Sequence, residues 1–80
     1  MIASFDSLSR IVYIQVKVRT PVVRTIEFDP TTILEIDSRN DLIAIEMIKP
    51  SSLILKRIAK KYERWELARI DLNSLQKSID

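Results

Sequence analysis

The first two-thirds of the chain alternates apolar and polar residues with a period of two, which is typical of half-buried β-strands. In residues 11–18 the residues of the apolar face are Val12, Ile14, Val16 and Val18. The same alternation predicts strands at residues 22–28 and 33–37, and a short first strand around residues 3–5. Residues 42–48 are apolar on both faces apart from Glu46, which predicts a central strand covered on both sides or nearly so.

Turns separate these segments although the chain contains no glycine. Thr20-Pro21 and Asp29-Pro30 interrupt the ladder, because proline has no amide hydrogen to donate. Residues 38–41 predict a hairpin turn in which Asn40 adopts the left-handed conformation that glycine usually supplies. Each connection is short enough to join antiparallel neighbours, so we expect a meander.

After Pro50 the apolar period changes to that of a helix, with Ser51 or Ser52 as the N-cap. The residues at helical spacing are Ile54, Leu55, Ile58, Ala59, Tyr62 and Trp65. We expect this face to pack on the sheet.

Two lengths of helix are compatible with the pattern. In one, the helix stops near Arg64 and a second helix starts at Asp71, with Leu72, Leu75 and Ile79 facing inward. In the other, a single helix runs to about Lys77 and places residues seven apart on one seam, namely Ile58, Trp65, Leu72 and Ile79. Both give one α+β domain over residues 1–80: an antiparallel β-meander of four to five strands at about 3–48, then a C-terminal amphipathic helical region at about 52–78.

The residue types that are missing narrow the possible functions. The chain has no histidine and no cysteine, so it lacks the commonest general base, the commonest metal ligand and any thiolate. Without glycine it also lacks the loops that cradle nucleotide phosphates. We therefore expect no enzyme, no cofactor and no metal site. The many isoleucines are typical of a heat-adapted source, and an A/T-rich genome gives the same bias.

Size and hydropathy give expectations about location and assembly. No apolar run is long enough to span a bilayer, and the first residues lack a signal-peptide layout, so we expect a cytoplasmic protein without membrane contact. A domain of 80 residues buries only about 60–65% of its unfolded surface. A second copy would add burial, so we expect a homodimer.

Charge is segregated along the chain. Residues 25–48 carry six acidic residues against Arg39 alone, and residues 49–64 carry six basic residues against Glu63 alone. The two blocks have net charges of −5 and +5 within a total of +2. Such asymmetry can steer an oppositely charged partner.

Each charge block contains candidate binding residues. The basic stripe suited to nucleic-acid phosphates is Lys56, Arg57, Lys60, Lys61 and Arg64. The alternative is a solvated helix surface whose cations lie near the helix C-terminus. The candidates for a protein partner are Glu35, Asp37, Glu46 and Trp65. Glu46 pairs with a basic residue or faces an interface, because an unpaired charge is costly to bury, and Trp65 either covers the core or anchors an interface. The spacing of Glu35, Asp37, Asp41 and Glu46 matches no metal-ligand loop.

Three stretches of the chain are similar to one family. Residues 5–14 contain Phe-Asp, a short turn and then Ile-Val-Tyr-Ile; residues 33–37 form an acid-ended strand; and residues 41–51 read Asp-Leu-Ile-Ala-Ile-Glu-Met-Ile-Lys-Pro-Ser. In this order they resemble the YuzE-like family of small prokaryotic proteins, a domain of unknown function, with Ala44 where that family has glycine. The resemblance implies a small antiparallel sheet with a helix and brings no catalytic residues. Some members look like antitoxin partners of small ribonuclease-like toxins.

These observations favour a small protein–protein interaction module, with an antitoxin-like neutraliser as its sharpest form. The alternative is a nucleic-acid-binding protein that uses the basic helix at residues 56–64.

Overall fold

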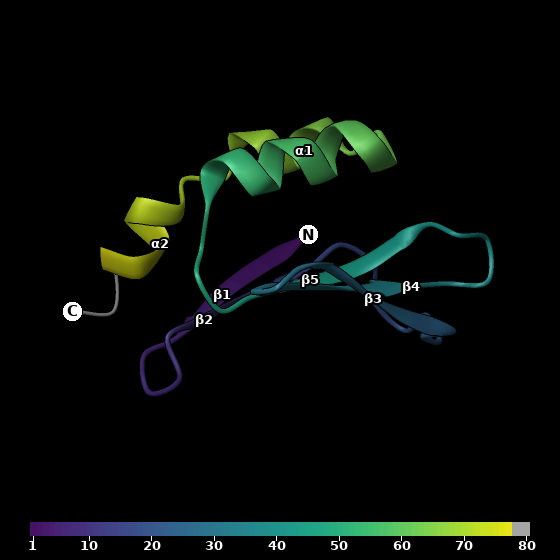
Figure 1. The fold of residues 1–80 in the computed structure, drawn as a ribbon, viewed down its shortest axis with the longest axis horizontal. Coiled ribbons are helices and arrows are strands. Elements are labelled where there is room, and N and C mark those ends of the chain that lie inside the picture. Colours follow the sequence, from purple (N-terminus) through teal and green to yellow (C-terminus); the bar gives the residue numbers. More distant parts are fainter. Residues whose placement is uncertain (78–80) are drawn as a thin grey trace.

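A computed structural model describes residues 1–77 and shows one five-stranded sheet with a helical layer on one of its faces (Figure 1). The strands are β1 (Ile2–Asp6), β2 (Ile11–Gln15), β3 (Arg24–Asp29), β4 (Thr32–Ile36) and β5 (Leu42–Met47). The helical segments are α1 (Ser52–Tyr62), the 3₁₀ helix η1 (Trp65–Arg69) and α2 (Leu72–Lys77). The predicted inward position of Ile79 lies outside the described residues.

The strand order is β1-β2-β5-β4-β3, and all neighbours are antiparallel. The α+β antiparallel sheet is therefore confirmed, with β1–β2 as a hairpin and β3–β4–β5 as a meander. One connection departs from the expected order, because the chain between β2 and β3 crosses to the far edge of the sheet. The amides of Val16 and Lys17 both donate to the carbonyl of Ile43, which ends the regular ladder there. Thr20 and Pro21 then pass beside the β4–β5 turn.

The core lies between the sheet and the helices. Its buried residues are Val12, Ile14, Leu34, Ile36, Leu42, Ile45, Met47, Leu55, Ile58, Ala59, Leu67 and Leu72. β5 is central, as predicted, and pairs with β2 on one side and β4 on the other. Ile43 and Ala44 are also buried but lie outside this core cluster. Within residues 1–77, no helix is both long and apolar enough to cross a membrane.

The helical region is broken rather than continuous. The Ser51 hydroxyl caps α1 by accepting the Ile54 amide at 3.3 Å. Glu63 ends α1 in the left-handed conformation (φ 55°), and its amide and that of Arg64 donate to the Ala59 carbonyl. Asp71 accepts the Asn73 and Ser74 amides at the start of α2. The two-helix alternative is therefore confirmed, and the single helix to Lys77 is wrong.

The breaks also remove the proposed seam. Ile58 of α1 is fully buried, whereas Trp65 is 59% exposed on η1. These two residues do not share one continuous helical face, since η1 follows a left-handed residue. α1 is also not the last element of the chain, so the C-terminal position predicted for the helix holds only for the helical region as a whole.

Candidate functional site

The helical layer leaves the second face of the sheet open (Figure 1). Strand register defines this open face, because directly paired residues point to the same side. One row runs Ser4–Tyr13–Glu46–Ile33–Glu27, and the next runs Ile2–Gln15–Ala44–Glu35–Thr25. We call these rows, with the neighbouring pair Asp6–Ile11, the open sheet face.

The open sheet face is acidic. Its strand residues include four carboxylates and no lysine or arginine: Asp6, Glu27, Glu35 and Glu46. β3 does contain Arg24, but this residue pairs with Ile36 on the side of the sheet that carries the core. The face therefore combines negative charge with apolar and aromatic side chains such as Ile33 and Tyr13.

A depression of about 370 Å³ lies in the middle of this face. Its lining residues are Tyr13, Thr25, Ile33, Glu35 and Glu46. The Tyr13 hydroxyl donates to Glu35 Oε1 at 3.1 Å. Partial burial, followed by the neighbouring Glu35 charge, raises the pKa of Tyr13, so the phenol keeps its proton at neutral pH.

Glu35 and Glu46 are diagonal neighbours on adjacent strands. Glu46 pairs with Ile33, two residues before Glu35, so the two residues lie about 7–8 Å apart and their β-carbons somewhat closer. Both side chains are half-buried, and neither forms an ion pair with any residue of the described chain. The sequence left two possibilities for Glu46: an ion pair with a basic residue, or a position facing outward. The structure has Glu46 on the open sheet face, with no ion pair in the described chain. Like charges at this spacing repel each other unless a cation comes between them.

Asp37 occupies a different environment from Glu35 and Glu46. It is only 7% exposed and accepts the Lys17 ammonium group at 2.8 Å. The same carboxylate accepts the amides of Arg39 at 2.8 Å and Asp41 at 3.0 Å in the β4–β5 turn. The Lys17 hydrogen bond, followed by these turn amides, lowers the pKa of Asp37 to about 2. This geometry stabilises the turn and leaves the carboxylate little exposed surface for a partner.

Asp37 belongs to an ionic network that joins three parts of the fold. Lys17 also contacts Asp41 at 2.9 Å, and Asp41 binds the Arg64 guanidinium. The network links the exit of β2, the β4–β5 turn and the end of α1. The hydrogen bond from Lys17 lowers the pKa of Asp41 most strongly, and the hydrogen bond from Arg64 lowers it further.

The fold separates the predicted basic stripe into two parts. Lys56, Arg57 and Lys60 are exposed on the outer side of α1. Lys61 and Arg64 lie at the end of α1 and line a groove beside the sheet. The lone tryptophan, Trp65, is exposed on η1 within the helical layer, away from the open sheet face. Of the four predicted partner residues, the fold therefore brings together Glu35 and Glu46 and places Asp37 and Trp65 elsewhere.

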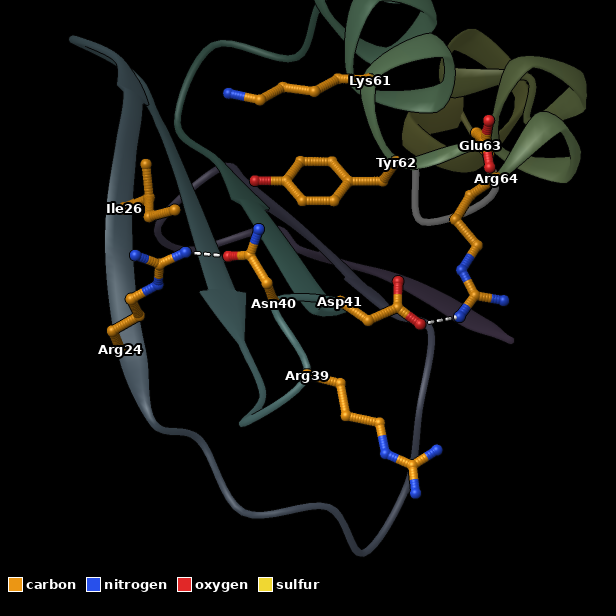
Figure 2. Close-up of a pocket in the computed structure, with 9 residues that line it drawn as sticks. All are labelled: Arg24, Ile26, Arg39, Asn40, Asp41, Lys61, Tyr62, Glu63 and Arg64. Carbon is orange, nitrogen blue, oxygen red and sulfur yellow. Dashed lines mark hydrogen bonds and ion pairs between the residues drawn. The ribbon is translucent and has the colours of Figure 1, made fainter.

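The groove beside Lys61 and Arg64 has a volume of about 600 Å³ (Figure 2). Its lining residues are Arg24, Ile26, Arg39, Asn40, Asp41, Lys61, Tyr62, Glu63 and Arg64. Sequence reasoning missed Arg24 and Arg39, because they reach this place only through strand order: β3 and the β4–β5 turn meet the end of α1. Neither residue belongs to a motif that could have revealed this.

Across residues 1–77, no three acidic side chains gather closely enough to hold a metal ion. Comparison with known proteins finds no match among family models, curated proteins or solved structures. The arrangement of surfaces on this fold is therefore the basis for a functional proposal.

Proposed function

We propose that this chain is a protein-binding module whose open sheet face receives a partner with a basic surface. The observation that supports it best is the pair Glu35 and Glu46, half-buried on a sheet face that carries no basic strand residue. Half-buried charges of one sign attract an oppositely charged surface, so they favour a complex with a basic partner over the free chain.

The chemistry of the depression favours a lysine or arginine side chain as the central contact. Such a side chain can lay its apolar stem on Ile33 and place its charged head between Glu35 and Glu46. The Tyr13 ring offers a cation–π surface at the rim of the same depression. A planar guanidinium fits two carboxylates best, because it donates several hydrogen bonds in fixed directions.

An antitoxin-like role is the sharpest form of this proposal. A small ribonuclease-like toxin must bind RNA phosphates, so its working surface is rich in lysine and arginine. An acidic sheet face can cover such a surface and exclude RNA from it. The proposed role is binding rather than catalysis, and the resemblance to the YuzE-like family stays a prediction that fits it.

The homodimer also stays a prediction. A symmetric dimer formed through the open sheet face would bring the Glu35 and Glu46 side chains of both copies together, where they would repel each other. The charge pattern therefore favours a different, basic chain on this face over a second copy.

Co-expression with the products of the two flanking genes tests the proposal. We expect one of these products to be basic and to co-purify with the wild-type chain. Double charge reversal, Glu35→Lys with Glu46→Lys, should abolish the complex, because the depression then repels the cation. The matched control, Lys56→Glu with Lys60→Glu on the outer side of α1, should retain the complex.

Circular dichroism should show that both double variants keep the fold. A complex that survives reversal of Glu35 and Glu46, or one lost only in the Lys56 and Lys60 control, would refute the proposal. Failure of both flanking products to bind the wild-type chain would refute it as well.

A further inference from the structure

The groove between the end of α1 and the edge strand β3 carries more positive than negative charge. Among its lining residues, four are basic and two are acidic. Asp41 is already engaged by Lys17 and Arg64. Arg24 donates to the amide oxygen of Asn40, which is a neutral acceptor and leaves the charge of Arg24 uncompensated.

Two of the cations are the most available for a ligand. Lys61 and Arg39 are both exposed, and neither forms an ion pair within the part of the chain that the structure covers. The Lys61 ammonium group lies 5.8 Å from the centre of the Tyr62 ring and 5.9 Å from that of Phe28. The attraction of lysine to a helix C-terminus accounts for part of this placement. It does not account for Arg24 and Arg39, which come from the sheet side.

The cations are spread along the groove rather than directed at one point. Figure 2 shows Lys61 and Tyr62 extending from the end of α1. Arg24 of β3 lies beside Asn40 of the β4–β5 turn, and Arg39 lies at the far end with its side chain pointing away from Lys61 and Tyr62. A single small anion needs converging donors, whereas a chain of repeated negative charges suits cations spaced along a channel. The Tyr62 side chain lies between them and offers an aromatic ring.

We propose that this groove binds single-stranded nucleic acid, with Arg39 and Lys61 contacting phosphates at its two ends and Tyr62 contacting a base between them. A positively charged groove with an aromatic platform is the arrangement by which proteins hold single strands without reading their sequence. This site is separate from the open sheet face, and it combines the end of α1 with the β4–β5 turn rather than using the outer side of α1. The proposal therefore does not rest on the protein-binding function above.

Fluorescence anisotropy of a labelled mixed-sequence DNA strand of about 12 nucleotides tests the proposal on the purified chain alone. We expect a dissociation constant below about 100 µM at about 50 mM salt. The double variant Arg39→Ala with Lys61→Ala should weaken binding at least about tenfold. It should also make the slope of log K against log salt shallower by about 1.4, since each lost phosphate contact of a single strand contributes about 0.7.

Three matched variants locate the site. Lys56→Ala with Lys60→Ala removes two cations from the outer side of α1 and should change affinity less than about threefold. Tyr62→Leu should weaken binding about fivefold or more, because stacking on the ring is lost, whereas Tyr62→Phe should bind like the wild type. Arg24 and Arg64 are left unchanged because they hold Asn40 and Asp41 in place.

Any of four results would overturn the proposal: no saturable binding by the wild-type chain, an equal loss in the outer-helix control, equal affinity for duplex DNA, or equal affinity for inorganic polyphosphate or a polyglutamate peptide. The variant with Glu35→Lys and Glu46→Lys should bind the strand at least as well as the wild type. Failure of one proposal is thus distinguishable from failure of the other.

Discussion

At the scale of single residues, the described chain places residues other than glycine at positions with a left-handed backbone. Four residues adopt positive φ in the described structure: Arg10, Arg19, Asn40 and Glu63. The value of 64° at Asn40 confirms the prediction for the hairpin turn, because asparagine enters this region at little cost. The other three were not predictable, since arginine and glutamate have no such preference. The Asp37 carboxylate then holds the turn around Asn40, because it accepts hydrogen bonds from the backbone amides of Arg39 and Asp41.

Asp37 gives the fold a specific dependence on pH. Its folded pKa is about 2, below the ordinary value of 3.8. The unfolded chain therefore takes up this proton first, and the stabilisation is fully present above pH 3.8 and is lost as pH falls towards 2. We expect the urea midpoint of the wild-type chain to fall over this window.

The variant Asp37→Asn provides the comparison. It should be less stable than the wild type at neutral pH, because Lys17 loses a charged acceptor, and the difference between the two should shrink as pH falls towards 2. Urea titrations followed by Trp65 fluorescence at a series of pH values measure this. A constant difference between the two proteins over the whole window would contradict the role assigned to Asp37.

At the scale of elements, alternation in the sequence identified the strands but not the way in which they pair. The predicted strand 11–18 ends early, at Gln15, because the Val16 and Lys17 amides share the carbonyl of Ile43. Strand order depends on which apolar faces pack together, and β5 enters between β2 and β4 to complete the core. The end of α1 was predicted only as one of two alternatives, since Glu63 breaks the helix without glycine or proline.

The broken helix predicts very different roles for two residues of η1. Leu67 is fully buried in the core, whereas Trp65 is 59% exposed. Leu67→Ala should lower the free energy of unfolding by about 2–5 kcal/mol, because it leaves a cavity. Trp65→Ala should lower it by less than Leu67→Ala does, because more than half of the Trp65 surface stays in contact with water. Urea denaturation followed by far-ultraviolet circular dichroism measures both, and a larger loss for Trp65 would favour the continuous seam.

At the scale of the whole molecule, the fold creates two surfaces of opposite charge. The open sheet face carries Glu35 and Glu46, both of which the sequence indicates as candidates: Glu46 because it interrupts an apolar strand, and Glu35 because it lies in the acidic block. The basic groove combines Lys61 and Arg64 with Arg24 and Arg39, and only the first two were foreseen. Local periodicity reveals which face of an element a residue occupies. It does not reveal which elements meet, so it gives no sign that Asp37 contacts Lys17 or that Arg64 contacts Asp41.

Chemical-shift mapping of the chain with a hexa-arginine peptide tests the central claim most directly, because the peptide supplies only the chemistry that the open sheet face should recognise. We predict that the amide shifts concentrate on β2, β4 and β5 around Tyr13, Glu35 and Glu46, and that Glu35→Lys with Glu46→Lys removes them. Shifts that are absent, or that concentrate on Asp41 and Glu63 in the groove, would contradict the proposed role of the open sheet face.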